Sequence, residues 1–221
     1  MKDLTALIKK AFDNTEFSVP GKYSKSVKNK LKEIENLNSP GLYIQVFKNE
    51  KNLDIFDANG HSTSSHQRPK ITVFKFSSTV KPGKSKNGVD RIIGYAKHMN
   101  MPNISSTGVQ PNPSNKKEVK EYEGISWYNS GGKVYSESLS FFGWIPLDSD
   151  RTAEELEKIW NNSVTDTLNG NFKKSTFGKG KGHMSESLTN VEIDLEKFKK
   201  EIIKTACVKI GKIYDAVKLY I

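Results

Sequence analysis

Residues 70–77 read KITVFKFS, which is the clearest β-strand pattern in the chain. Ile71 and Val73 would lie on one face of this strand, and Phe74 and Phe76 on the other. A strand that is apolar on both faces usually lies inside a sheet that is covered on each side. The pattern therefore predicts a buried sheet, with residues 70–77 as one of its inner strands.

Two pairs of segments predict β-hairpins. Residues 42–48 (LYIQVFK) and 53–57 (LDIFD) are rich in β-branched and aromatic side chains, and a short polar segment separates them. Residues 122–129 and 133–144 flank a Ser-Gly-Gly turn in the same way. Both pairs are expected to form antiparallel strands that follow each other in the chain.

Apolar side chains at helical spacing predict five helices. Thr152 and Glu155 have the spacing of a capping box at the start of the fourth helix, and the last helix is expected to be the longest. The five segments are residues 4–12, 22–37, 89–99, 152–168 and 195–220. Together with the strands they predict the α+β class, with a mixed or antiparallel sheet, N-terminal helices and a long C-terminal packing helix.

The length of 221 residues suits one domain that spans residues 1–221, with long loops near 100–117 and 171–187. The single cysteine, Cys207, excludes an internal disulfide and is expected to pack as a small apolar side chain. No apolar run is long enough to span a membrane, and the N-terminus does not have the pattern of a signal peptide. We therefore expect a cytoplasmic protein, or a virion component if the chain belongs to an assembly.

The charge distribution is the strongest indication of a partner. Residues 58–117 contain ten basic side chains and one acidic side chain, whereas residues 121–157 contain eight acidic and two basic ones. Such an asymmetric field attracts polyanions. The basic residues are 32 lysines and 3 arginines, so a plainer interpretation is a lysine-rich surface that keeps the protein in solution. The separation of the two signs favours a polyanion, and nucleic acid is the expected one.

Residues 81–88 read KPGKSKNG and are expected to form a loop between a strand and a helix. Backbone N–H groups at the start of a helix, with three lysines and a serine beside them, can bind phosphate. A triphosphate-binding loop is disfavoured because that motif needs glycine where this chain has Ser78. The alternative is an exposed connecting loop without a ligand.

The leading hypothesis is a non-catalytic protein that binds a polyanion through backbone phosphates. A glycine- and lysine-rich segment, residues 173–183, is expected to contribute accessory contacts as a mobile loop. The residues expected to contact phosphate are Arg68, Lys81, Lys84, Lys86, Arg91 and Lys97, with Lys179 and Lys181 as accessories. No cofactor is expected.

Two other function classes remain open. Copies of this chain or other subunits would be the partners if it were a subunit of a viral or phage particle, with its opposite charges complementing neighbouring subunits. A metal-dependent nuclease would use clustered carboxylates and a lysine, for which Asp54, Asp57 and Lys75 are the candidates. A metal site at His61 and His66 is disfavoured because no further ligand has suitable spacing.

Overall fold

The computed structural model describes residues 1–13, 22–48, 54–56, 70–72, 77–98, 132–176 and 189–214. Six strands within these residues form one antiparallel sheet. They are β1 (Lys2–Asp3), β2 (Gly41–Lys48), β5 (Ser78–Ser85), β6 (Leu139–Pro146), β7 (Lys173–Thr176) and β8 (Thr189–Glu192). Their order in the sheet is β1-β6-β2-β5-β8-β7.

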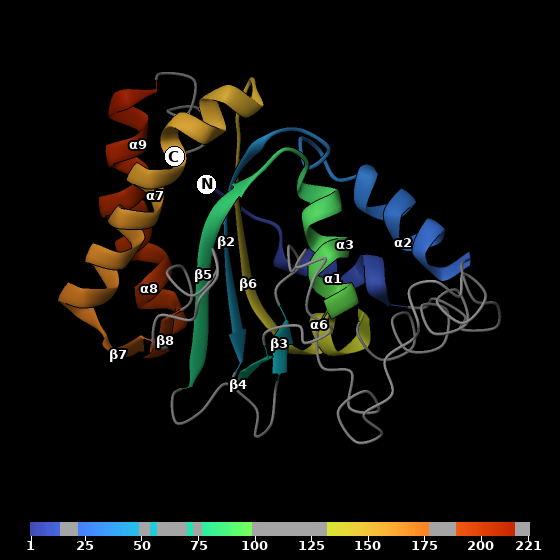
Figure 1. Cartoon of the computed structure of the whole chain (residues 1–221), viewed down its shortest axis with the longest axis horizontal. Helices are drawn as coiled ribbons and strands as arrows, with labels where there is room; N and C mark the ends of the chain where they lie inside the picture. Colours follow the sequence, from blue (N-terminus) through green and yellow to red (C-terminus); the bar gives the residue numbers. More distant parts are fainter. Residues whose placement is uncertain are drawn as a thin grey trace, which may run out of the picture.

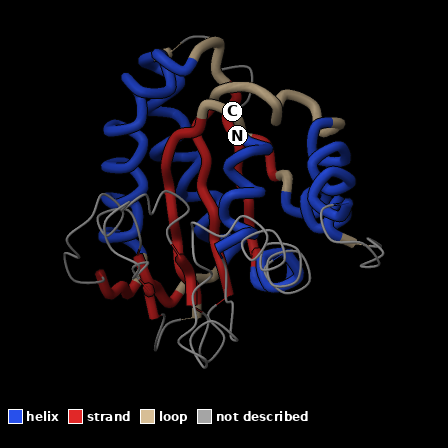
Figure 2. Tube along the Cα trace, turned by 45° about the vertical axis from the view of Figure 1, so that its right-hand side comes forward, coloured by secondary structure: helices blue, strands red, loops and turns tan. Residues whose placement is uncertain are grey.

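Helices cover both faces of this sheet (Figures 1 and 2). One face is covered by α1 (Thr5–Phe12), α2 (Lys22–Lys32), α3 (Gly88–His98) and α6 (Gly132–Ser138). The other is covered by α7 (Asp150–Asn171), α8 (Leu195–Ile202), the π-helical turn η2 (Ile203–Cys207) and α9 (Val208–Ile213). The prediction of an α+β fold with N-terminal helices and a C-terminal packing helix is confirmed. None of the helices in the described residues combines the length and the apolar character needed to cross a membrane.

Strand β2 lies at the centre because both of its faces are apolar. Leu42 and Ile44 point to the layer of α7 and α8, and Tyr43 and Phe47 point to the layer of α1 and α3. All four side chains are at most 2% exposed. Alternation with a period of two thus places one strand in two separate cores.

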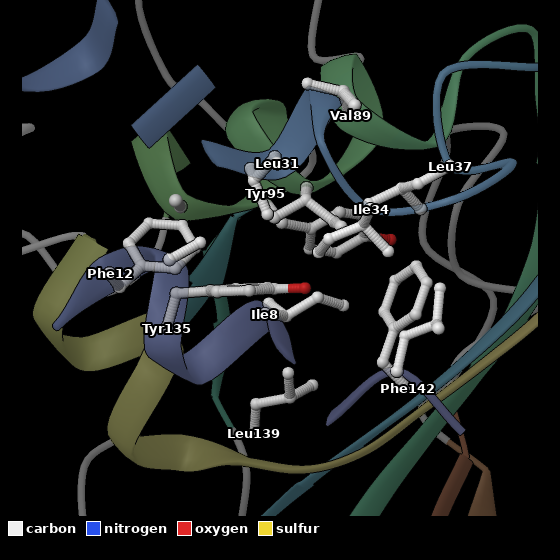
Figure 3. Close-up of a cluster of buried hydrophobic side chains, with 14 of the residues drawn as sticks. Ile8, Phe12, Leu31, Ile34, Leu37, Val89, Tyr95, Tyr135, Leu139 and Phe142 are labelled. Atoms are coloured by element: carbon white, nitrogen blue, oxygen red, sulfur yellow. The ribbon is translucent and has the colours of Figure 1, made fainter. Parts of the chain in front are cut away.

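The first core is aromatic and lies between the sheet and α1, α2, α3 and α6. Figure 3 shows its side chains converging from these helices and from β6. The ring of Phe47 packs against Tyr95 of α3 and Tyr135 of α6, with ring centroids 6.1 Å and 5.8 Å away. Phe12 of α1 reaches Tyr135 at 5.6 Å. These rings fasten three helices to the middle of the sheet.

The second core is built around α7. Trp160 is fully buried there, and its indole Nε1 donates a hydrogen bond of 2.9 Å to the backbone carbonyl of Tyr43. Phe198 and Ile202 of α8 pack into the same cluster. Cys207 is also buried there, and burial raises the pKa of its thiol to about 11. The thiol is therefore protonated at neutral pH and packs as an apolar side chain.

The first predicted hairpin is wrong, because β2 pairs with β5 and β6 and not with the segment that follows it. That segment, β3 (Asp54–Phe56), pairs instead with β4 (Lys70–Thr72) in a separate two-stranded sheet. Residues 70–72 are therefore not part of the main sheet, and residues 73–76 lie outside the described part of the chain. Local alternation identifies a strand but not its distant partner.

The second predicted hairpin is wrong in its second half. Residues 132–138 form the helix α6, and β6 begins only at Leu139. The helix places Tyr135 in the first core. Residues 122–129 are outside the described residues.

Three helix ends also differ from the prediction. Helix α2 ends at Lys32, and a turn with Asn36 at φ 61° follows, although Ile34 and Leu37 are still buried. The C-terminal helical run ends at Ile213, so α7 with 22 residues is longer. Helix α7 begins at Asp150, earlier than predicted, and Ser149 caps it by accepting a hydrogen bond from the backbone N–H of Thr152.

We expect the substitution Ser149→Ala to lower the free energy of unfolding by about 1 kcal/mol, because the backbone N–H of Thr152 in the first turn of α7 loses its acceptor. Chemical denaturation measures this loss. Ser149→Asp keeps an acceptor and is the matched control. An equal loss in both variants would show that the cap does not stabilise α7.

Candidate phosphate-binding site

The segment expected to be a phosphate-binding loop is largely a β-strand. Residues 78–85 form β5, and two residues, Lys86 and Asn87, connect it to α3. The hydroxyl of Ser85 donates to the carbonyl of Asn87 at 2.6 Å and accepts from its N–H at 3.1 Å, which tightens the connection. The side chain of Asn87 then accepts from the N–H of Asp90 in the first turn of α3. The predicted loop between strand and helix is thus reduced to a tight turn.

Pro82 is accommodated in β5 because this half of the strand has, among the described strands, a neighbour on one side only. Strand β8 pairs with β5 as far as Val80, whereas β2 pairs with its whole length. The N–H of Lys84 donates to the carboxylate of Glu157 on α7 at 3.2 Å, away from β2. Because backbone direction alternates along a strand, Pro82 lacks its N–H on this same open side.

The positive charges of Lys84 and Lys86 are countered by acidic side chains of α7. The ammonium of Lys84 lies 3.5 Å from Asp150 and 3.7 Å from Glu154, and that of Lys86 lies 3.3 Å from Asp150. The side chain of Lys86 is still 81% exposed. The acidic stretch that is separate in the sequence is therefore adjacent to these two lysines in space, and it reduces their attraction for a polyanion.

Lys81 points to the opposite face of the sheet, toward α3. It is 2% exposed, and its ammonium lies 5.5 Å from the ring centroid of Tyr95. Its cross-strand neighbour is the fully buried Gln45, whose side-chain oxygen accepts from the hydroxyl of Tyr135 at 2.8 Å. The Nε2 group of Gln45 has no hydrogen-bond partner among the described residues. Burial is the main cause that raises the pKa of Tyr135 well above its ordinary value, and the nearby Tyr43 raises this pKa further.

Arg91 of α3 is the half-buried member of the same neighbourhood. Its guanidinium carbon lies 5.4 Å from the ring centroid of Tyr43, and its Nη2 donates to the carbonyl of Lys84 at 3.2 Å. The adjacent Asp90 forms an ion pair with Lys28 at 2.7 Å. The described residues provide no acidic partner for Arg91, so its charge and its other donors are available.

Four of these side chains form one group, which we call the tyrosine–cation cluster: Tyr43, Lys81, Arg91 and Tyr95. The rings of Tyr43 and Tyr95 meet edge to face at 6.5 Å, and each carries one of the two cations on its face. Strands β2 and β5 and helix α3 supply the four residues. Tyr43, Lys81 and Tyr95 are at most 2% exposed, so Arg91 is the member that can contact an anionic ligand, and Lys81 adds positive charge behind it.

The other expected contacts cannot be added to this cluster. Lys97 lies in α3, but its side chain is outside the described part, and Arg68, Lys179 and Lys181 are outside it altogether. Part of the expected mobile loop is ordered, because Lys173–Thr176 form β7 at the edge of the sheet. His61, His66, Asp57 and Lys75 also lie outside the described residues. Among those described, no group of three or more His, Cys, Asp or Glu side chains is arranged to hold a metal ion.

Sequence reasoning identified both cations of the cluster but missed its two tyrosines. Arg91 and Tyr95 are four residues apart and share a face of α3, which is a signal that the sequence offers. Tyr43 looks like one more apolar strand residue, and only the register of β2 against β5 brings it to this group. No protein-family model matches the chain, and neither a curated protein nor a solved structure matches it.

Gly83 keeps the cluster closed, because a Cβ atom at this position would lie 2.7 Å from the hydroxyl of Tyr43. We expect Gly83→Ala to displace Tyr43 and to lower the free energy of unfolding by about 1–3 kcal/mol through overpacking. Gly170→Ala is the control, since its Cβ would meet nothing within 4 Å and α7 should gain about 0.5–1 kcal/mol. Denaturation curves measure both; a neutral Gly83→Ala would contradict this packing.

Proposed function

We propose that this protein binds nucleic acid through backbone phosphates at the tyrosine–cation cluster. The observation that carries the proposal is the arrangement of Arg91, a half-buried cation that lies over the ring of Tyr43 and has no acidic partner among the described residues. The ring contact and the hydrogen bond from Nη2 to the carbonyl of Lys84 hold the guanidinium in place, and its remaining donors can form hydrogen bonds to a phosphate. Lys81 adds a second positive charge behind it.

The same geometry supports binding without sequence specificity. Phosphates are common to all nucleotides, so contacts made only to them position a nucleic acid without reading its bases. The compensated lysines, Lys84 and Lys86, would contribute less than Arg91 because Asp150 lies beside both. The expectation from the sequence gives all the cations of this segment equal weight, whereas this ranking places Arg91 above Lys84 and Lys86.

We expect Arg91→Ala to weaken binding to unrelated oligonucleotides by a similar factor and to lower the salt slope of binding by about one counterion. Fluorescence anisotropy with labelled oligonucleotides at several salt concentrations measures both quantities. Lys158→Ala removes one exposed positive charge from α7 and is the matched control. Thermal melting verifies that each variant is folded. Wild-type protein that binds no oligonucleotide at low salt would refute the proposal.

Cleavage of a phosphodiester bond is the second candidate function. The hydroxyl of Tyr43 lies against Gly83, on a ring that carries Arg91. In hydrolysis a water oxygen attacks phosphorus, the bond to the sugar oxygen breaks, and the water proton must be accepted. Arg91 and Lys81 would stabilise the negative charge of the transition state, and the hydroxyl of Tyr43 is the candidate proton acceptor.

If the protein cleaves nucleic acid, Tyr43→Phe should abolish cleavage while binding is retained, because the ring that holds Arg91 stays in place and the hydroxyl is lost. Plasmid and RNA incubated with Mg²⁺ or Mn²⁺ and analysed on gels provide the measurement. Tyr135→Phe removes a buried phenol hydroxyl of the same core outside the cluster and is the matched control. Full cleavage by Tyr43→Phe would exclude a catalytic role of the Tyr43 hydroxyl. If the wild type leaves both substrates intact, binding is the one candidate function that remains at the cluster.

Other parts of the proposal do not depend on the cluster. A cytoplasmic location is proposed together with nucleic-acid binding. The alternative of a subunit in a larger assembly stays a prediction, as does a nuclease site at Asp54, Asp57 and Lys75. Light scattering of the purified chain tests the first of these alternatives, since an assembly subunit would form particles larger than a monomer.

A further inference from the structure

The C-terminal helical run, residues 195–213, carries a concentration of positive charge that the sequence patterns did not single out. It contains six lysines and two glutamates. Five of the lysines are exposed, and we call them the lysine row: Lys197, Lys200, Lys204, Lys209 and Lys212. They lie on the layer of α8 and α9, on the side of the sheet opposite α3 (Figure 1).

A π-helical turn aligns this run with the core. The buried residues Phe198, Ile202, Ala206 and Ile210 are spaced by four, and in a regular α-helix each such step would rotate the stripe by about 40°. The turn η2 absorbs this drift, since the N–H of Val208 bonds to the carbonyl of Ile203, five residues back. The wider turn keeps the apolar stripe against α7 along the whole run.

The same turn keeps the lysines on the outside. Lys200 and Lys204 are four residues apart, but Lys204 and Lys209 are separated by five, and the π-turn lies between them. In a regular α-helix, Lys209 would rotate toward the side on which Phe198 is buried. With the extra residue accommodated, the lysines from 200 to 212 follow one exposed side over about 18 Å.

Most charges of the lysine row are not compensated. Lys200, Lys204, Lys209 and Lys212 form no ion pair with any described residue, whereas Lys199 on the flank is paired with Asp3 at 3.1 Å and with Glu196 at 3.0 Å. Lys197 lies over the ring of Phe172 at 5.6 Å. The half-buried Glu201 is the one acidic residue of the run near the row, besides the paired Glu196.

We propose that the lysine row binds the sugar–phosphate backbone of double-stranded nucleic acid, as a second contact surface independent of the tyrosine–cation cluster. The proposal rests on the proposed function for the chemical class of the partner. A duplex carries about one negative charge per 1.7 Å of its axis, so a straight row of cations over about 18 Å faces several phosphates at once. Each lysine that meets a phosphate releases a counterion.

Three features of the run favour a duplex backbone over other polyanions. Residues 195–213 contain no arginine, asparagine or glutamine, so they lack the side chains that most often read base edges. Their one aromatic residue, Phe198, is fully buried and cannot stack on the bases of a single strand. The apolar stripe packs against α7 and is not free to insert into a membrane, which leaves Ile203, Val208 and Ile213 as the exposed large apolar side chains of the run.

The test replaces three central lysines at once, in the variant Lys200→Gln, Lys204→Gln, Lys209→Gln. The control variant Lys10→Gln, Lys25→Gln, Lys32→Gln removes the same charge from exposed positions on α1 and α2, across the sheet. Anisotropy with a labelled 20-base-pair duplex and the matching single strand gives the slope of log affinity against log salt. We expect the row variant to lower this slope for the duplex by about 0.9 for each lost contact, and the control variant to leave it unchanged.

The outcomes separate this inference from the proposed function. If the row variant binds the duplex like the wild type while Arg91→Ala binds it less well, the inference is wrong and the proposed function stands. If the wild type prefers the single strand, or if the row variant loses binding to vesicles of anionic lipid and not to the duplex, the assignment of the partner is wrong. If the wild type binds no nucleic acid, both fail. Equal melting temperatures establish that the variants are folded.

Discussion

The pairing of β2 with β5 on one side and with β6 on the other is the constraint on which the molecule depends. The pairing places β2, whose two faces are both buried, at the middle of the sheet, so that a layer of helices must cover each face. Tyr43 illustrates the consequence. Its ring belongs to the layer of α3, and its carbonyl is held by Trp160 of α7 on the other side. The geometry of the tyrosine–cation cluster is therefore fixed from both cores.

The positive side chains of this protein are grouped by the face of the sheet on which they lie, and not by the segment of sequence from which they come. The lysines of β5 alternate, so that Lys84 turns to the acidic start of α7 while Lys81 turns to the tyrosines. A basic stretch in the sequence is thereby divided between two faces of the sheet, and only the Lys84 face meets the acidic side chains of α7. The exposed lysines of α8 and α9 are spaced to stay together. Proximity in the sequence and proximity on the surface are thus different properties here.

Regular helices were the part of the fold that the sequence predicted well, because α3 and α7 repeat their apolar residues with the period of a helix. Strand β5 was missed because Pro82 and Gly83 are typical of a turn, and their acceptance in a strand depends on an open edge that no local pattern reveals. Two of the predicted cations, Lys81 and Arg91, lie over the neighbouring rings of Tyr95 and Tyr43. This arrangement follows from a register between strands that are distant in the chain.

The open half of β5 has a consequence for the behaviour of the protein in concentrated solution. An unprotected strand margin invites backbone pairing with a neighbouring molecule and, from there, the growth of aggregates. Here one donor is deleted by the ring of Pro82, and the next along the same margin is occupied by Glu157. Pro82 and Glu157 thus oppose the addition of another strand to β5 beyond the point where its pairing with β8 ends.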